Sequence, residues 1–261
     1  MRIVTPLGDF ALDDSSRGLP LVLLHGFPLD RSMWRPITPL IRDGWRVIAP
    51  DLLGLGESAV RPAASIAEIT DSVFAVLDAI GVHDRVVLGG LSMGGIVCFE
   101  AWRRYSSRIA ALLLIDTRPN AETPEGRASR YESAAHIERE GPRIVADSMR
   151  GRLFAPSTSS AVQEEWFARI GVQPRVGAAA CARALGDRAD SWTTLETINV
   201  PTLVVVGDQD VITPPALANE MHAKIRGSQL AVIKDAGHMP PVEQPGSTAS
   251  AINDFLAGLG E

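Results

Sequence analysis

Short, continuous apolar segments alternate with amphipathic helical segments along most of this chain of 261 residues. The helical segment 65–81 is the clearest, since its apolar residues fall on one face and Ser65 and Glu68 form a capping box at its start. Apolar runs without polar alternation are typical of strands buried on both faces of a parallel sheet. Six such runs have the length of a strand: 19–26, 45–51, 84–90, 108–116, 200–208 and 228–235. The alternation therefore predicts an α/β fold with a mainly parallel sheet flanked by helices.

Two regions depart from this alternation. Residues 2–14 contain two short strand-like segments around Pro6-Leu7-Gly8, which predicts a hairpin. Residues 119–195 contain no apolar strand segment and instead show helical patterns rich in Arg, Ala and Glu. We therefore expect a core formed by residues 1–118 and 196–261, with residues 119–195 inserted as a helical cap.

The composition restricts the partners and the compartment. A net charge of −6 and a pI near 5.4 argue against nucleic acid or an anionic membrane as the main partner, because both require a basic patch. No apolar run is long enough to span a bilayer, and the first residues do not form a secretory signal. Cys98 and Cys181 show neither metal-ligand spacing nor a disulfide framework. We expect a cytoplasmic protein without a metal or cofactor, and the sequence does not indicate an oligomeric state.

The sequence Gly90-Leu91-Ser92-Met93-Gly94 stands between an apolar strand segment and a helical segment. This G-x-S-x-G pattern in a strand–turn–helix setting is the nucleophile elbow, in which a sharp turn exposes a serine hydroxyl. Ser92 also precedes a helix N-terminus, where free N–H groups favour negative charge. Ser92 is therefore the candidate nucleophile.

A serine nucleophile needs a general base and an acid that orients the base, and in this fold they follow the serine along the chain. His238 is the candidate base because it alone lies in a loop after a strand near the C-terminus. Structural or solvated roles are expected for the other histidines, His25, His83, His136 and His222. The acid should follow the strand segment 200–208, where Asp210 is preferred to Asp208; Asp116 remains a third candidate.

The developing oxyanion also needs hydrogen-bond donors. The backbone N–H of Met93 is one candidate, and the N–H of Phe27 in the loop "HGFPLDRSMW" is the other. Apolar residues of the cap and of the core loops should form the wall of a mostly apolar acyl pocket. The residues expected to bind substrate are Phe27, Met93, Phe154, Trp166, Val211 and Met239.

Five segments together resemble the α/β-hydrolase superfamily over essentially the whole chain. "HGFPLDRSMW", "DLLGLGES", "GGLSMGGIV", "GDQDVITPP" and "AGHMPPVEQP" are similar, in order, to its oxyanion loop, strand-four loop, elbow, acid loop and histidine loop. The resemblance implies an α/β-hydrolase fold with Ser92 as nucleophile, His238 as base and Asp210 as acid. Among subgroups, the chain looks most like small bacterial carboxylesterases and 3-oxoadipate enol-lactonase-like proteins.

These observations predict a serine hydrolase that cleaves small-molecule esters or lactones through an acyl-enzyme. The same three residues could also serve a thioesterase, a C–C bond hydrolase or a perhydrolase. A non-catalytic ligand receptor on this fold is the alternative from a different class. The serine at the elbow argues against haloalkane dehalogenases and epoxide hydrolases, which carry aspartate there, and "GLGES" lacks the third glycine of a nucleotide-binding motif.

Overall fold

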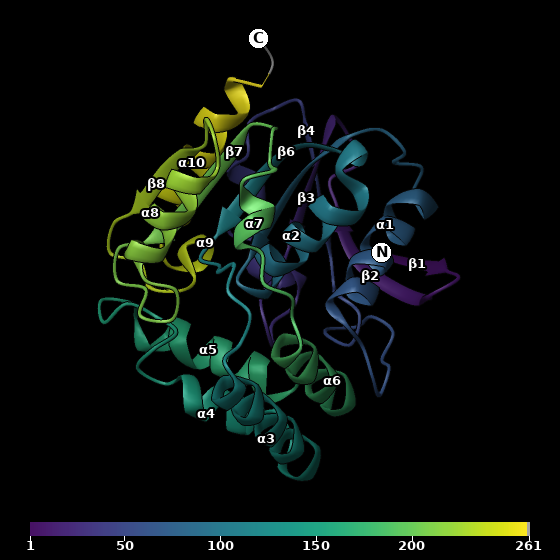
Figure 1. Ribbon diagram of the computed structural model, residues 1–261, viewed down its shortest axis with the longest axis vertical. Coiled ribbons are helices and arrows are strands. Elements are labelled where there is room, and N and C mark those ends of the chain that lie inside the picture. The colour runs from purple at the N-terminus through teal and green to yellow at the C-terminus, as the bar shows by residue number, and fades with distance from the viewer. Residues whose placement is uncertain (260–261) are drawn as a thin grey trace.

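A single eight-stranded sheet forms the centre of the computed structural model, which describes residues 1–259 (Figure 1). The strands lie in the order β1-β2-β4-β3-β5-β6-β7-β8. β1 and β2 form an antiparallel hairpin and β2 pairs antiparallel with β4, while every other pairing is parallel. The predicted mainly parallel sheet and the hairpin are thus confirmed. The strands span Arg2–Thr5 (β1), Gly8–Asp14 (β2), Leu19–Leu24 (β3), Trp45–Pro50 (β4), Val86–Leu91 (β5), Ile109–Ile115 (β6), Thr202–Gly207 (β7) and Gln229–Ile233 (β8).

Helices cover both faces of this sheet. The connections β4–β5, β5–β6, β6–β7 and β7–β8 all advance in one direction, so right-handed crossovers place their helices on one face. That layer holds α1 (Ile66–Ala79), α2 (Met93–Tyr105), α7 (Trp192–Leu195) and α8 (Pro215–Lys224), which contact one another in turn. The opposite face carries the short helices η1 (Arg31–Trp34) and η2 (Thr38–Leu40), with α9 (Pro240–Glu243) and α10 (Pro245–Ala257) packed against them. The short helix η3 (Ser106–Arg108) follows α2. Within residues 1–259, no helix is both long and apolar enough to cross a membrane.

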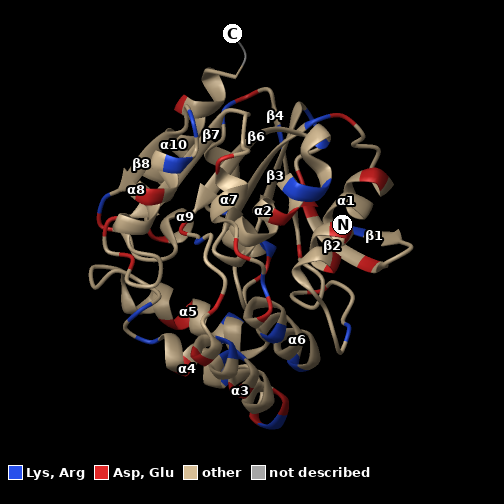
Figure 2. Cartoon of the chain, viewed as in Figure 1, with Lys and Arg blue, Asp and Glu red and all other residues tan. Residues whose placement is uncertain are grey.

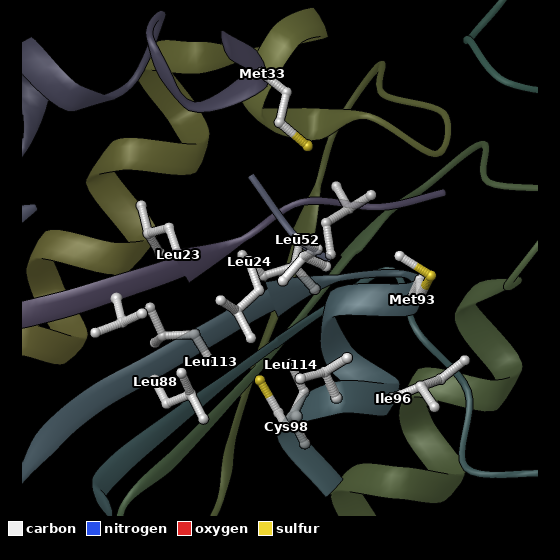
Figure 3. Close-up of a cluster of buried hydrophobic side chains, with 14 of the residues drawn as sticks. Leu23, Leu24, Met33, Leu52, Leu88, Met93, Ile96, Cys98, Leu113 and Leu114 are labelled. Carbon is white, nitrogen blue, oxygen red and sulfur yellow. The ribbon is translucent and has the colours of Figure 1, made fainter. Parts of the chain in front are cut away.

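The core lies on both faces of the central strands, and the cluster in Figure 3 includes side chains of α2 on one face and Met33 of η1 on the other. α1 begins with the predicted capping box between Ser65 and Glu68. Both cysteines are buried, and burial raises the pKa of the Cys181 thiol to about 12 and raises that of Cys98 as well. Neither thiol is therefore activated as a nucleophile. The buried side chains labelled in this cluster are Leu23, Leu24, Met33, Leu52, Leu88, Met93, Ile96, Cys98, Leu113 and Leu114.

The chain between β6 and β7 contains helices and no strand, as the sequence predicts for most of this region. Four of these helices gather at one end of the sheet (Figure 1): α3 (Pro124–Glu140), α4 (Arg143–Met149), α5 (Ser160–Gly171) and α6 (Arg175–Gly186). α6 rests directly on the loop after β4. A Cβ atom on Gly177 would lie 1.8 Å from the carbonyl oxygen of Gly54, so only glycine permits this approach. The helical segment therefore covers the carboxyl ends of the strands, where parallel sheets carry their sites.

Candidate active site

Ser92 occupies a strained turn between β5 and α2. Its backbone has φ 54° and ψ −110°, a conformation that non-glycine residues rarely adopt and that often marks a functional site. The flanking glycines make the turn possible: a Cβ atom on Gly94 would lie 2.2 Å from the carbonyl oxygen of Leu24, and one on Gly90 would lie 2.2 Å from the carbonyl carbon of Gly94. The Ser92 N–H donates to the carbonyl of Ile115 at 3.0 Å, which fixes the turn to β6. The local geometry thus has the features of a nucleophile elbow.

Among the backbone N–H groups near Ser92 that donate to no protein atom within residues 1–259, two are candidates to bind an oxyanion. One belongs to Met93, the first residue of α2, and the other to Phe27 in the loop after β3. Gly26 keeps this loop next to the elbow, because a Cβ atom there would lie 3.3 Å from the Cβ atom of Ser92. Both N–H groups are therefore free to bind an oxyanion formed at Ser92.

His25 holds the loop after β3 in place. Its Nδ1–H donates to the carbonyl of Gly26 at 2.9 Å, and its Nε2 accepts from the N–H of Leu52 at 2.9 Å. This pattern requires the neutral imidazole, in agreement with the burial that lowers its pKa. His25 thus has the structural role that the sequence predicts for it.

Asp210 and His238 form a buried pair. The Asp210 Oδ2 lies 2.7 Å from the His238 Nδ1, and both residues are at most 4% exposed. Asp210 Oδ1 also accepts from the N–H groups of Ile212 and Thr213 at 2.7 and 3.0 Å, and the Thr213 hydroxyl donates to Oδ2. Burial raises the pKa of Asp210, but the charge of His238 and these hydrogen bonds outweigh burial and hold the pKa well below its usual value. Asp210 is therefore an ionised carboxylate that orients the imidazole.

The other two acid candidates lie in different surroundings. Asp208 is exposed, and its carboxylate accepts a long bond of 3.4 Å from the N–H of Ala236. Asp116 is buried at the end of β6, with Oδ1 accepting from the N–H of Gly207 at 2.9 Å. The structure thus brings Asp210 to His238 and leaves Asp208 at the surface.

Asp116 lies next to Asp210 in a buried cluster, with an oxygen of each carboxyl group within 4.8 Å of the other. Within residues 1–259, its Oδ2 has no hydrogen-bond partner. Burial together with the charge of Asp210 raises the pKa of Asp116 well above its usual value. These surroundings favour the neutral, protonated form of Asp116, with the Asp210 carboxylate nearby.

The same three side chains could in principle hold a metal ion, since ligand atoms of Asp116, Asp210 and His238 all lie within 4.8 Å of one another. However, both oxygens of Asp210 already accept from protein donors, and the His238 Nδ1 faces Asp210. The three side chains therefore do not present a set of free lone pairs that could coordinate one metal ion.

We expect Asp116→Asn to raise the stability at neutral pH and to retain ester hydrolysis, because the amide donates to Asp210 without taking up a proton. In the folded wild-type protein, the raised pKa keeps Asp116 protonated at pH values where its carboxyl group has already lost the proton in the unfolded chain. Wild-type stability should therefore fall as pH rises between the two pKa values, by at most about 1.4 kcal/mol per pH unit, and the Asn variant should lack this fall. Urea unfolding of both proteins across pH 4 to 8 measures the difference. Asp116→Ala, which offers no donor, serves as the contrast, and an Asn variant that loses turnover would make Asp116 the orienting acid.

Glu243 fixes the loop that carries His238. Its Oε1 accepts from the N–H groups of Gly237 and Met239 at 3.0 and 2.9 Å. Its Oε2 accepts from the N–H of Ala155 at 2.7 Å, and the His238 N–H donates to the carbonyl of Leu153 at 2.9 Å. One carboxylate thus joins the histidine loop to the segment after α4, and the helical region contributes to the position of the imidazole.

Ser92 and His238 face one small cavity of about 60 Å³, called the inner cavity below. Their side chains are not hydrogen-bonded to each other, and contacts of this kind often tighten only when substrate binds. The inner cavity adjoins an outer cavity of about 670 Å³, because five residues line both: Phe27, Arg118, Arg130, Met149 and Ile212. The inner cavity is completed by Ile96, Thr117, Leu185, Arg188 and Thr213.

Of the six residues expected to bind substrate, only Phe27 lines these cavities. Met93 and Met239 are fully buried in the core, and Val211 is 61% exposed. Phe154 packs edge-on against Phe167 with 5.7 Å between the ring centres, and Trp166 is also buried. The apolar part of the inner cavity wall is formed instead by Phe27, Ile96, Met149, Leu185 and Ile212, so a mostly apolar acyl pocket remains a prediction.

Sequence reasoning missed the arginines of the inner cavity. Arg118 follows β6 at the carboxyl end of a central parallel strand, a position that favours binding residues and could have been noticed. Arg130 lies on α3 and Arg188 lies just after α6, 58 residues further along the chain. No local pattern indicates that these two side chains meet.

Comparison with known proteins places the chain in a family. Residues 21–251 match the model of the alpha/beta hydrolase family. An esterase from Thermogutta terrifontis, solved with malate bound, is 39% identical, with a TM-score of 0.96 and coverage of 100% of this chain and 99% of that one. A pimeloyl-[acyl-carrier protein] methyl ester esterase of Neisseria meningitidis is 28% identical over 90% of this chain and 92% of its own. The 3-oxoadipate enol-lactonase 1 of Acinetobacter baylyi is 24% identical over 92% and 89%. The chain therefore belongs to the alpha/beta hydrolase family, in the group of its esterases and lactonases.

Proposed function

We propose that this protein hydrolyses small carboxylic esters or lactones through an acyl-enzyme formed on Ser92. The observation that carries the proposal is the ionised Asp210 at 2.7 Å from His238 Nδ1, with the imidazole facing the same cavity as the elbow serine. A hydroxyl, an imidazole and a carboxylate in this relation can deprotonate a serine for attack on a carbonyl. The resemblance to esterases and an enol-lactonase supports the same class of reaction.

In the first half-reaction, the Ser92 Oγ adds to the ester carbonyl while His238 Nε2 takes the hydroxyl proton. Asp210 holds the Nδ1–H and stabilises the imidazolium that forms. The N–H groups of Phe27 and Met93 bind the oxyanion of the tetrahedral intermediate. The imidazolium then gives its proton to the leaving alcohol, and the acyl group stays on Ser92.

In the second half-reaction, water replaces the Ser92 hydroxyl as the nucleophile. His238 takes a proton from the water as its oxygen adds to the acyl carbon, and the same two N–H groups bind the second oxyanion. Collapse of this intermediate returns the proton to the Ser92 Oγ and releases the acid. For a lactone, the leaving alcohol remains attached to the released acid, so the product is a hydroxy acid.

The helical segment 119–195 acts in this proposal as a cap that limits the size of the substrate. It contributes Met149, Leu185 and Arg188 to the inner cavity, which is only about 60 Å³. Beyond this cavity, the outer cavity carries charged side chains that a long alkyl chain would have to desolvate.

We therefore expect p-nitrophenyl acetate to hexanoate to be hydrolysed much faster than palmitate, and without activation at a lipid interface. Initial rates across the acyl series, with and without detergent micelles, measure this preference. Trp192→Ala provides a control, because Trp192 stands at the end of the segment 119–195, beside α8, and lines a separate surface pocket away from both cavities, so its loss should leave the ranking unchanged. Palmitate as the preferred substrate would contradict a size-limiting cap.

Covalent labelling tests the acyl-enzyme directly. A fluorophosphonate should modify Ser92 and no other serine, as located by peptide mass spectrometry, and acyl esters should protect it. Turnover of p-nitrophenyl esters would exclude a non-catalytic receptor. Faster reaction with thioesters, with β-diketones or with added peroxide would move the assignment to a thioesterase, a C–C hydrolase or a perhydrolase, respectively.

A further inference from the structure

The wall of the inner cavity is positively charged. Arg118, Arg130 and Arg188 line it together with Ser92, and no Asp or Glu lines it in the part of the chain that the structure describes. The protein as a whole carries a net charge of −6, so this wall has the opposite sign to the average surface. Figure 2 shows Lys and Arg on α3 and α6, the helices at the cap end of the sheet. A local cluster of one sign in a cavity attracts ligands of the other sign.

One carboxylate neutralises part of this cluster. Glu122 Oε1 accepts from Arg188 Nη1 at 2.6 Å and from Arg130 Nε at 3.1 Å. Arg188 also donates to the carbonyls of Asn120 and Leu185 at 2.7 and 2.8 Å, and its side chain is only 2% exposed. Arg188 and Arg130 are thus held in place by Glu122 and the surrounding backbone.

Arg118 has no such counter-ion. Its Nη2 donates to the carbonyl of Ile212, and no carboxylate within residues 1–259 lies within 4.0 Å of its guanidinium group. Arg118 lines both cavities, so its other N–H groups are open to a bound molecule. Partial burial and the charge of Arg188 lower the pKa of Arg118.

The outer cavity does not supply the missing counter-ion. Its wall adds Arg152 and His136 on the basic side and Glu132 beside Glu122 on the acidic side. None of these acids pairs with Arg118. Arg118 is half-buried, so a cation without a partner there is partly removed from water, and an anionic group of the substrate would compensate its charge.

We propose that the site selects esters that carry a second, free carboxylate, which Arg118 binds while Ser92 attacks the ester carbonyl. The inference rests on the proposed function, and names its substrate class. A guanidinium group matches a carboxylate through two parallel N–H···O bonds, and the small inner cavity suits this planar monoanion. In the reaction, the C–O bond of the ester is cleaved with one water, giving an acid and an alcohol, and the second carboxylate is unchanged.

Matched ester pairs test this selectivity. Monomethyl succinate and methyl 4-methylpentanoate have nearly the same shape but differ in charge. The second pair, 3-acetoxypropanoate and 3-methylbutyl acetate, differs in the same way but carries the charge on the alcohol side. Hydrolysis is followed in a pH-stat. We expect kcat/KM to be at least about tenfold higher for one of the anionic esters than for its neutral partner, since hydrogen bonds to charged groups contribute free energies of this size. The ester that is preferred shows whether the acyl or the alcohol part faces Arg118.

The Arg118→Gln variant should reduce this anionic-to-neutral ratio by roughly tenfold or more, and Arg118→Lys should restore part of it. Arg183→Gln is the matched control, because Arg183 pairs with Glu138 on the surface of the cap and lines neither cavity. The control should leave the ratio unchanged. Added salt should lower the ratio in the wild-type protein.

Succinate binding separates this inference from the proposed function. Calorimetric titration of succinate into Ser92→Ala should show binding that Arg118→Gln in the same background abolishes. A wild-type ratio near one, or a ratio insensitive to Arg118→Gln, overturns the inference while ester hydrolysis stands. If no ester of either charge is hydrolysed, the proposed function fails, and absence of succinate binding then removes the inference as well.

Discussion

Ser92→Ala is expected to lower kcat/KM for p-nitrophenyl butyrate by roughly four to six orders of magnitude, down to the residual rate that binding and the oxyanion donors sustain. No other group can replace the Ser92 hydroxyl at the elbow. Both cysteines are buried with raised thiol pKa values, and Thr117, which also lines the inner cavity, donates its hydroxyl to the Ser92 carbonyl at 2.7 Å. Steady-state assays at matched protein concentration measure the loss.

The fold should survive this substitution. Alanine meets the same steric limits as serine at φ 54°, and the N–H of residue 92 keeps its bond to Ile115. The thermal midpoint should therefore change little, and Ser107→Ala, an exposed serine on η3, should match the wild type in both activity and stability. A folded Ser92→Ala protein that retains more than a few per cent of the activity would exclude Ser92 as the nucleophile.

The sequence predicted the sheet and the position of the elbow because both depend on local patterns. A strand buried on two faces must be apolar at consecutive residues, as in Ile109–Ile115, and the elbow requires glycines at Gly90 and Gly94 to avoid backbone clashes. The order of serine, acid and histidine then restricted the acid to the loop after the strand Thr202–Gly207. The choice of Asp210 over Asp208 was made from the position in the turn, and the hydrogen bonds to His238 give it a physical basis.

The cavity wall could not be predicted in the same way. Apolar side chains such as Phe154 and Trp166 can be buried against any apolar neighbour, so an apolar residue in the sequence does not indicate whether it will face the cavity or the core. Arg188 is buried because Glu122 and two backbone carbonyls surround it. Glu122 and Asn120 precede Arg188 by 66 and 68 positions in the sequence, and the other carbonyl, of Leu185, lies at the end of α6. The polarity of the pocket is therefore a property of tertiary packing, which a composition rich in Arg and Ala does not reveal.

The sequence could not predict the raised pKa of Asp116, although it identified Asp116 as a candidate for the acid. Its protonation follows from burial beside Asp210, and only the packing of β6 against β7 brings the two carboxyl groups together. With Asp116 uncharged, the pair carries a single negative charge. That charge is available to the imidazole of His238.

Asp210→Asn is expected to lower kcat by roughly three to four orders of magnitude, whereas Asp208→Asn should stay within about twofold of the wild type. The amide that replaces the Asp210 carboxylate would present an N–H or a weaker acceptor to His238 Nδ1, so the imidazole would no longer be held with its Nε2 free to accept the Ser92 proton. Asp208 is exposed and does not touch the imidazole. The two substitutions remove the same charge from the same loop, which makes Asp208→Asn a matched control.

Stability measurements complete this comparison. Because the folded-state pKa of Asp210 is depressed, its ionisation stabilises the fold above the pKa of the unfolded chain, and this contribution is lost as pH falls toward the folded-state pKa. Asp210→Asn should therefore lower the free energy of unfolding at neutral pH, and the difference from the wild type should narrow in acid. The reverse ranking of activities would assign the acid to Asp208. If both variants remain active, the carboxyl group of Asp116 becomes the candidate, because it lies in the same buried cluster as His238.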